Sequence, residues 1–433
     1  MMSDCGLDYI ELLQQEVDRT SAKLLYLRNE EEPEEAPPPR HTPHTCSAPR
    51  RLAISPGLGG KPLTPPFTEN LRRLLFGRTV RVFNFDWRKS FFHFREPNSE
   101  LSYALQVDQG GARAVQMVIQ ARIIKHLLFS QQGGSEGRSL LSLTELGPPE
   151  QQGALAAALS DSLWLAGQEE SATVTMVTED DSPKPPSEYR LDLLTEKMHT
   201  FVFNRKEELS SFLLDHIHCF QEEGGHGVVL FLYSLVCSRT IDRIREDLDS
   251  STAHLLQRRL GNFVCSQALL NLLLTGRATP HVCNGTQAPG GGAAPLDPPL
   301  QGVLSRGDIG YLHWSREQMD RDRLLQVGSM LKTPRFPVWL CCINSTYSVL
   351  FSLTRSLLSD WRTEHQFQLF YYNGQNSQNS TARLTIDTHS HHWEAPSVDP
   401  GVDLEKRFPS LEMTIRTKWE GASINWGGIP PFY

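Results

Sequence analysis

The sequence lacks three features that would each have assigned it to a class. Its most apolar stretch, residues 227–237, is about half the ~20 residues that a membrane-spanning helix needs. It has no excess of positive charge, since 42 Lys+Arg face 50 Asp+Glu and the formal net charge is −8, so nothing indicates nucleic-acid binding. The first residues contain neither the basic nor the apolar region of a secretory signal. We therefore expect a soluble intracellular protein of the cytoplasm or nucleus, with no membrane and no nucleic-acid partner.

Metal-binding patterns are scarce as well. The eight cysteines form no CxxC pair and show no spacing typical of metal ligands. Most lie among apolar neighbours, where a thiol packs as a small hydrophobic group. Asp387, His389, His391 and His392 are residues that could ligate a metal, but they follow an expected strand as a strand end or loop. We predict neither a metal nor another cofactor.

Composition divides the chain into three parts. Residues 1–29 include an amphipathic helix over 7–29, which either docks on the body or binds a partner. Residues 30–66 are acidic and then proline-rich, and they have too few large apolar side chains to form a core, so a linker is expected. Residues 67–433 have globular composition and form the main domain.

The strongest helical pattern in that domain covers residues 114–129. Its apolar residues recur every four positions, whereas Gln116, Gln120 and Lys125 lie off that face. Alternation predicts an early strand over 79–85, and apolar runs predict late strands over 338–343, 347–353 and 367–372. Residues 201–245, 255–274 and 316–327 are expected to be mainly helical. An early helix, a helical middle and a sheet late in the chain predict an α+β fold.

A glycine pair leads directly into the helix at 114–129. Gly110 and Gly111 are followed by Ala112 and Arg113. The N-terminus of a helix offers unpaired N–H groups and a positive partial charge, which lower the pKa of a thiol placed there. Thiol proteases present their nucleophile in this way, although a glycine pair before a helix can also be a simple tight turn.

Further stretches make the pattern specific. They are Gly110–Gly111 and residues 125–129, 230–235, 272–278, 302–311, 327–337, 348–351 and 415–419. In these stretches and in their order, the chain from about residue 66 to the end resembles the MINDY-family deubiquitinases of the branch with the larger catalytic domain. It is most similar to a paralogue of that branch that is described as inactive. The resemblance implies a variant of the papain-like cysteine-protease fold.

The resemblance also places the family's catalytic positions on this sequence. The nucleophilic cysteine falls on Arg113, the general-base histidine on Thr346 and the oxyanion-stabilising glutamine on Val107, one residue from Gln106. A proline that precedes the nucleophile falls on Ala112. Arginine is no nucleophile, threonine no general base near neutral pH, and valine offers no side-chain hydrogen bond to an oxyanion. We therefore expect a degenerate cysteine-type deubiquitinase that is not an enzyme and has no catalytic residues.

The expected function follows from that resemblance. An inactive relative would bind ubiquitin or polyubiquitin without cleaving it. Two alternatives stay open, namely an interaction protein that no longer engages ubiquitin and a weak thiol hydrolase that uses a displaced cysteine such as Cys342. Because a cation is disfavoured at a helix N-terminus, we also expect Arg113 to turn away from the helix axis and pair with Asp108.

Overall fold

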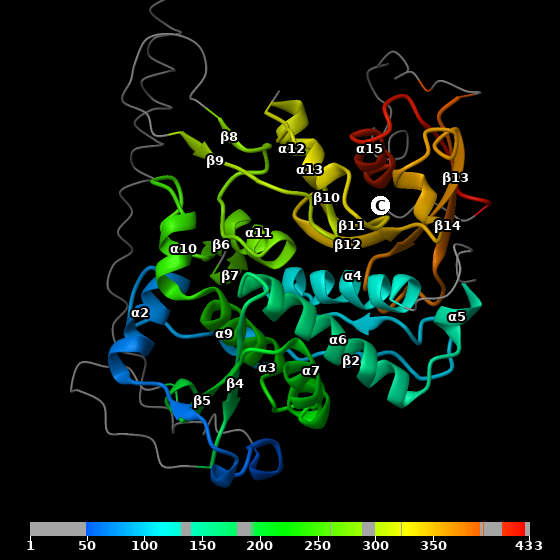
Figure 1. Cartoon of the computed structure of the whole chain (residues 1–433). Coiled ribbons are helices and arrows are strands. Elements are labelled where there is room, and N and C mark those ends of the chain that lie inside the picture. Colours follow the sequence, from blue (N-terminus) through cyan, green and yellow to red (C-terminus); the bar gives the residue numbers. More distant parts are fainter. Residues whose placement is uncertain are drawn as a thin grey trace, which may run out of the picture. The chain divides into compact units, whose positions relative to one another are not determined.

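A six-stranded sheet between helices organises the molecule (Figure 1). A computed structural model describes residues 49–130, 140–179, 192, 194–259, 261–287, 299–321, 323–389, 393 and 409–428. The helix predicted over residues 7–29 and residues 30–48 of the expected linker lie outside the described residues. The chain has a mixed composition of helices and strands, so the α+β prediction is confirmed at that level.

Helices occur from the beginning of the described chain to near its end. They are α2 (Pro65–Phe76), α3 (Phe85–Lys89), α4 (Arg113–Phe129), α5 (Leu141–Thr144), α6 (Pro148–Ala166), α7 (Lys206–Asp215), α8 (His218–Gln221), α9 (Gly227–Arg239), α10 (Ile241–Asp247), α11 (Gln267–Thr275), α12 (Arg316–Asp320), α13 (Ser329–Lys332) and α15 (Ser410–Arg416). Short 3₁₀ turns occur at Arg50–Leu52, Pro56–Leu58, Thr195–Lys197 and Arg355–Leu358.

The strands form several sheets. They are β1 (Lys61–Pro62), β2 (His93–Phe94), β3 (Leu105–Gln106), β4 (Ala172–Val177), β5 (Met198–Phe203), β6 (Leu256–Arg259), β7 (Asn262–Cys265), β8 (Thr286–Gln287), β9 (Leu300–Gln301), β10 (Gly310–Trp314), β11 (Val338–Ile343), β12 (Thr346–Phe351), β13 (Gln366–Tyr372), β14 (Ala382–Asp387) and β15 (Ser423–Asn425). The large sheet has the order β10-β11-β12-β13-β14-β15, and only its β10–β11 pair is parallel.

The large sheet buries both of its faces. Side chains alternate along a strand, so Leu340 of β11 joins the core that contains α4, whereas Trp339 joins Leu411 and Ile415 of α15. Figure 1 shows the same layers, with α15 on one side of the sheet, α4 on the other, and α6 beyond α4. The sheet and α4 together position the site described below.

Helix α4 is buried all around rather than on one face. Gln116 and Gln120, expected to lie off the apolar face, are 1% and 0% exposed. Their amides are satisfied by the chain: Gln120 Nε2 donates to the carbonyl of Tyr103 (3.1 Å), and Gln116 Nε2 donates to the carbonyl of Phe91 (3.0 Å). The predicted helix is therefore confirmed, but its amphipathic reading is wrong because loops and α6 cover the polar positions.

Part of the expected linker belongs to the folded body. Leu52, Ile54 and Leu63 are buried, and β1 pairs with β5 in a three-stranded sheet of order β1-β5-β4. Ile54 also forms a bridge with Thr178. Residues 49–66 thus contribute apolar contacts despite their proline content.

Three secondary-structure predictions are wrong. Residues 79–85 form no strand; instead Asn84 caps α3 by accepting the backbone N–H of Trp87 (3.3 Å). Residues 255–274 begin with the β6–β7 hairpin before α11. The helix expected over 316–327 stops at Asp320. In each case the tertiary partners, which the local pattern does not contain, decided the conformation.

Among the described residues, no helix is long and apolar enough to cross a membrane.

Candidate functional site

A groove of about 390 Å³ opens beside the N-terminus of α4. Its walls come from the Gly110–Gly111 turn, the β6–β7 hairpin, the start of α11 and the strands β10 to β12 with the segment around α12. Besides Gly110, Gly111 and Arg113, the lining residues are Gln257, Arg259, Val264, Cys265, Gln267, Leu270, Tyr311, His313, Ser315, Glu317, Gln318, Leu325, Cys342, Ser345 and Tyr347. The glycine pair and Arg113 therefore lie in one groove with residues from distant parts of the chain.

The close packing around Gly111 requires a glycine at that position. A Cβ at Gly111 would lie 1.6 Å from the carbonyl oxygen of Phe263 in β7, so no larger residue fits without moving the hairpin. The same carbonyl accepts the indole N–H of Trp87 at 2.8 Å. This close approach fixes the hairpin against the turn before α4 and forms one side of the groove.

Arg113 begins α4 and is 6% exposed. Its Nε donates to the carbonyl of Tyr347 (3.1 Å) and its Nη2 to the carbonyl of Asn373, while Nη1 has no hydrogen-bond partner within the described part of the chain. Burial lowers the pKa of the guanidinium, against a smaller opposing effect of Tyr371, and an arginine still stays protonated at neutral pH. A buried cation thus ties the helix to the sheet.

The predicted ion pair of Arg113 with Asp108 is wrong. Asp108 Oδ2 accepts from Nε2 of Gln116 (3.1 Å), and the Asp108 backbone N–H donates to Oε1 of the same side chain (3.2 Å). No carboxylate of the described residues lies within 4.0 Å of the Arg113 guanidinium. Backbone carbonyls take the place of the acid because the side chain points across the groove wall toward the strand ends.

A thiol and an imidazole lie side by side in the groove. Cys342 is the register partner of His313 in the parallel β10–β11 pair, so both side chains face the same side of the sheet. His313 Nε2 donates to Oε1 of Gln318 (2.9 Å), which leaves Nδ1 as an acceptor 3.5 Å from the hydroxyl of Tyr311. Burial lowers the pKa of His313, so the ring is neutral at neutral pH.

Both thiols that line the groove are protonated in their buried surroundings. Burial raises the pKa of the Cys342 thiol, although hydrogen bonds with Tyr311 and Tyr347 lower it. Burial also raises the pKa of the Cys265 thiol to about 12. The expectation that these residues pack as core cysteines is confirmed for their burial, but both also line the groove.

The other two degenerate positions lie outside this groove. Thr346 is exposed and lines a separate hollow of about 220 Å³ with Ser348, Asn373 and Leu411, on the α15 face of the sheet. Its neighbour Tyr347 faces the groove, because successive strand residues point to opposite faces. The structure therefore does not bring Thr346 and Arg113 into one cavity, although the two hollows flank the same strand.

Val107 is a packing residue in this structure. It is 6% exposed and contacts the backbone at Gly374, where an added Cβ would lie 3.1 Å from the Val107 Cβ. Gln106 is exposed at the end of β3. Ala112, the residue before Arg113, is 1% exposed and precedes the first helical residue. Neither Val107 nor Gln106 lines the groove.

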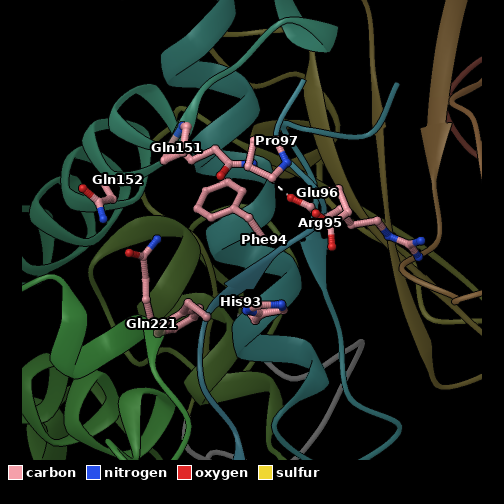
Figure 2. A pocket seen from close by; sticks show the side chains of 10 residues that line it. His93, Phe94, Arg95, Glu96, Pro97, Gln151, Gln152 and Gln221 are labelled. Carbon is pink, nitrogen blue, oxygen red and sulfur yellow. Dashed lines mark hydrogen bonds between the residues drawn. The ribbon is translucent and has the colours of Figure 1, made fainter. Parts of the chain in front are cut away.

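A different hollow of about 260 Å³ lies beside β2 and the N-terminus of α6 (Figure 2). Figure 2 shows Gln151 and Gln152 of α6 with Phe94 and Pro97 close by, and Gln221 next to His93. Gln151 Nε2 donates to the carbonyls of Arg95 (3.1 Å) and Ser102 (2.7 Å). This amide group therefore stabilises the loop that contains these residues and is not available to bind a ligand. This hollow contains none of the residues that the sequence predicted.

The histidines that follow Asp387 in the sequence are only partly described. His391 and His392 lie outside the described residues, and His389 stacks on His365 with ring centroids 4.5 Å apart. In the described ranges, no group of three or more potential ligands is placed to hold a metal ion.

Sequence reasoning missed most of the groove. Arg259, Tyr311 and Gln318 gave no signal, because the packing of the β6–β7 hairpin and the parallel pairing of β10 with β11 cannot be read from local patterns. A His in an apolar strand followed by Ser315 as a helix cap was the one available hint.

Comparison with known proteins gives the family. The family model described as "Deubiquitinating enzyme MINDY-3/4, conserved domain" matches residues 72–428. The chain is 36% identical to "Probable ubiquitin carboxyl-terminal hydrolase MINDY-4" of Mus musculus over 371 residues, which is 86% of this chain and 47% of that protein. The Homo sapiens protein of that name is also 36% identical, over 86% of this chain and 46% of its own length.

A second group of relatives is more distant. "Ubiquitin carboxyl-terminal hydrolase MINDY-3" of Danio rerio is 28% identical over 296 residues, which is 62% of each chain. This chain thus spans about half the length of its MINDY-4 relatives and somewhat more of MINDY-3. No solved structure matches it significantly.

These comparisons correct one sequence-based expectation. We expected a protein that is not an enzyme, but the matching domain is described as a deubiquitinating enzyme and the relatives are named hydrolases. The expectation is contradicted because it relied on single positions, whereas the similarity covers the whole domain. The predicted resemblance itself is confirmed: the chain belongs to the MINDY-3/4 family of deubiquitinases.

Proposed function

We propose that the groove beside α4 binds the carboxyl-terminal tail of ubiquitin. The observation that carries the proposal is its position, at the N-terminus of a buried helix directly after the Gly110–Gly111 turn. The relatives are named for hydrolysis at the ubiquitin carboxyl terminus. A narrow groove at a helix N-terminus is the place where a papain-like protease receives an extended peptide, and α4 against the sheet supports that arrangement here.

The groove has polar groups suited to an extended backbone. Gln257 and Arg259 lie on one face of β6, and Val264 is the register partner of Gln257 in β7. Side-chain amides and guanidinium groups donate to peptide carbonyls, while Gln257 can also accept from peptide N–H groups. Ser345 adds a hydroxyl on the opposite wall.

Isothermal titration with ubiquitin tests the proposal. Ubiquitin and polyubiquitin should bind, and ubiquitin that lacks its carboxyl-terminal tail should bind at least ~10-fold more weakly, since most tail contacts would be lost. Gln257→Trp should fill the groove and weaken binding. Arg258→Trp is the matched control, because Arg258, the next residue of β6, is also exposed but lies on the opposite face. Equal affinity for intact and tail-less ubiquitin would reject the proposal.

A second candidate function is thiol hydrolysis by Cys342. The register of Cys342 beside His313 favours it. The Cys342 sulfur would attack the carbonyl carbon at the end of ubiquitin, and the thiol proton would pass through His313 to the departing amine. Water would then hydrolyse the thioester. Since the thiol is protonated as placed, the step depends on His313 as the base.

An electrophilic ubiquitin probe distinguishes this candidate. The wild-type chain should form a covalent adduct that Cys342→Ser abolishes. Cys237→Ser is the control, because Cys237 does not line the groove and its pKa is raised by burial to about 12. No adduct with the wild-type chain would reject hydrolysis by Cys342 and leave the binding proposal to the titration.

A further inference from the structure

Two cationic side chains line the groove, and among the described residues no carboxylate lies within 4.0 Å of either. Arg113 lies at its wall, and its buried Nη1 has no hydrogen-bond partner in the described part of the chain. Arg259 is exposed, and no described carboxylate lies within 4.0 Å of it. Glu317 is the only acidic residue among the described lining residues, and it is paired with Arg321 at 3.0 Å. The groove is therefore locally positive in a chain whose net charge is −8.

Both arginines line the same groove as Tyr347. Arg113 Nε donates to the carbonyl of Tyr347. Burial raises the pKa values of Tyr347 and Cys342, and the charge of Arg259 opposes that rise at both groups. The positive end of the 17-residue helix α4 adds to the same field.

A neutral hydrogen-bond donor lines the same groove. Burial raises the pKa values of Tyr311 and Tyr347 well above the usual range, so both hydroxyls stay protonated. The Tyr311 hydroxyl faces Nδ1 of His313, which leaves the Tyr347 hydroxyl as the donor for a ligand. Two guanidinium groups, a helix N-terminus and a hydroxyl donor together are the surroundings that a carboxylate needs when it leaves water. An amide carbonyl would gain much less from the charges.

We propose that the groove discriminates in favour of the free carboxyl terminus of ubiquitin over ubiquitin joined through an amide. The inference depends on the proposed function, because it assumes that the tail enters the groove. Arg259 provides the exposed positive charge that contacts the carboxylate. Arg113 and the N-terminus of α4 add to the positive electrostatic potential of the groove. The favoured ligand is unconjugated ubiquitin or a chain with a free carboxyl end, in which this terminal charge is present.

The test compares two forms of one ligand. Ubiquitin with its native carboxyl terminus is titrated against ubiquitin whose terminal carboxylate has been converted to a primary amide, so that only the charge differs. We expect the full chain to bind the acid about tenfold more tightly than the amide, the effect of one charge-assisted contact. The acid should lose affinity with added salt more steeply than the amide.

Variants assign the preference to the residues. Arg259→Gln should lower the ratio of the two affinities at least about threefold, and the double change Arg259→Gln with Arg113→Met should bring it close to 1. The far-UV circular dichroism spectrum of each variant should match that of the wild type, which shows that the variant is folded. Arg306→Gln is the control, since Arg306 is an exposed arginine that lines another hollow.

Each outcome decides between the two proposals. Equal binding of acid and amide by the wild-type chain overturns the inference and leaves the proposed function intact. Binding of neither form overturns both. A preference that survives the double change, or that Arg306→Gln reduces as much as Arg259→Gln, shows that general surface charge is responsible and overturns the assignment to the groove.

Discussion

Replacing Arg113 by two different residues tests how a buried cation is tolerated without an acidic partner. Arg113→Lys keeps the charge but cannot donate to the carbonyls of Tyr347 and Asn373 together. It therefore loses a charge-assisted hydrogen bond of ~1.5–3 kcal/mol. Arg113→Met loses both bonds, but it also removes a cation whose burial costs several kcal/mol and an unfavourable interaction of ~0.3–1 kcal/mol with the helix dipole.

We therefore expect the methionine variant to be more stable than the lysine variant by about 2 kcal/mol. Urea unfolding followed by tryptophan fluorescence measures the difference, and the chain has eight tryptophans. Arg383→Lys and Arg383→Met are the controls, since Arg383 is exposed on β14, and each should change stability by less than ~0.5 kcal/mol. A lysine variant at position 113 as stable as the methionine variant would refute the reasoning.

Two further changes test packing and charge. Gly111→Ala places a Cβ 1.6 Å from the Phe263 carbonyl oxygen, so we expect a loss of at least ~3 kcal/mol in urea unfolding; a neutral result would show that the hairpin moves freely. Asp161 is partly buried, which raises its pKa, but Lys125 and Lys206 lower it to about 2 overall. Its ionisation therefore stabilises the fold by ~2 kcal/mol above about pH 4, and this stability is lost as the pH falls toward 2. Asp161→Asn should flatten stability over that range, and an unchanged slope would contradict the ion-pair contribution.

The sheet and the central helix could be predicted because their signals are local. Residues 338–343 form β11 and residues 367–372 lie within β13 as the apolar runs indicated. The helix predicted over 114–129 is α4, which begins one residue earlier at Arg113. Long, strongly apolar segments adopt the secondary structure that their local pattern favours in almost any tertiary context.

The groove could be predicted only in part. Gly110, Gly111 and Arg113 are adjacent in sequence, so a motif reveals them. The partners of Arg113 are carbonyls 234 and 260 residues away, and a backbone oxygen leaves no trace in a sequence. An acidic neighbour was therefore predicted instead. His313 and Cys342 are joined by a parallel register, which no turn between them specifies.

The bonds of Arg113 couple three distant stretches of the chain. One side chain at the start of α4 holds the carbonyl that follows the start of β12 and the carbonyl just past the end of β13. A substitution at position 113 therefore alters the surroundings of residues 347 and 373. The effects on stability of substitutions at these three positions will not be additive. Whether a substitution at position 113 is tolerated therefore depends on the residues at these two strand ends. A residue that one relative accepts at this position need not be accepted by another.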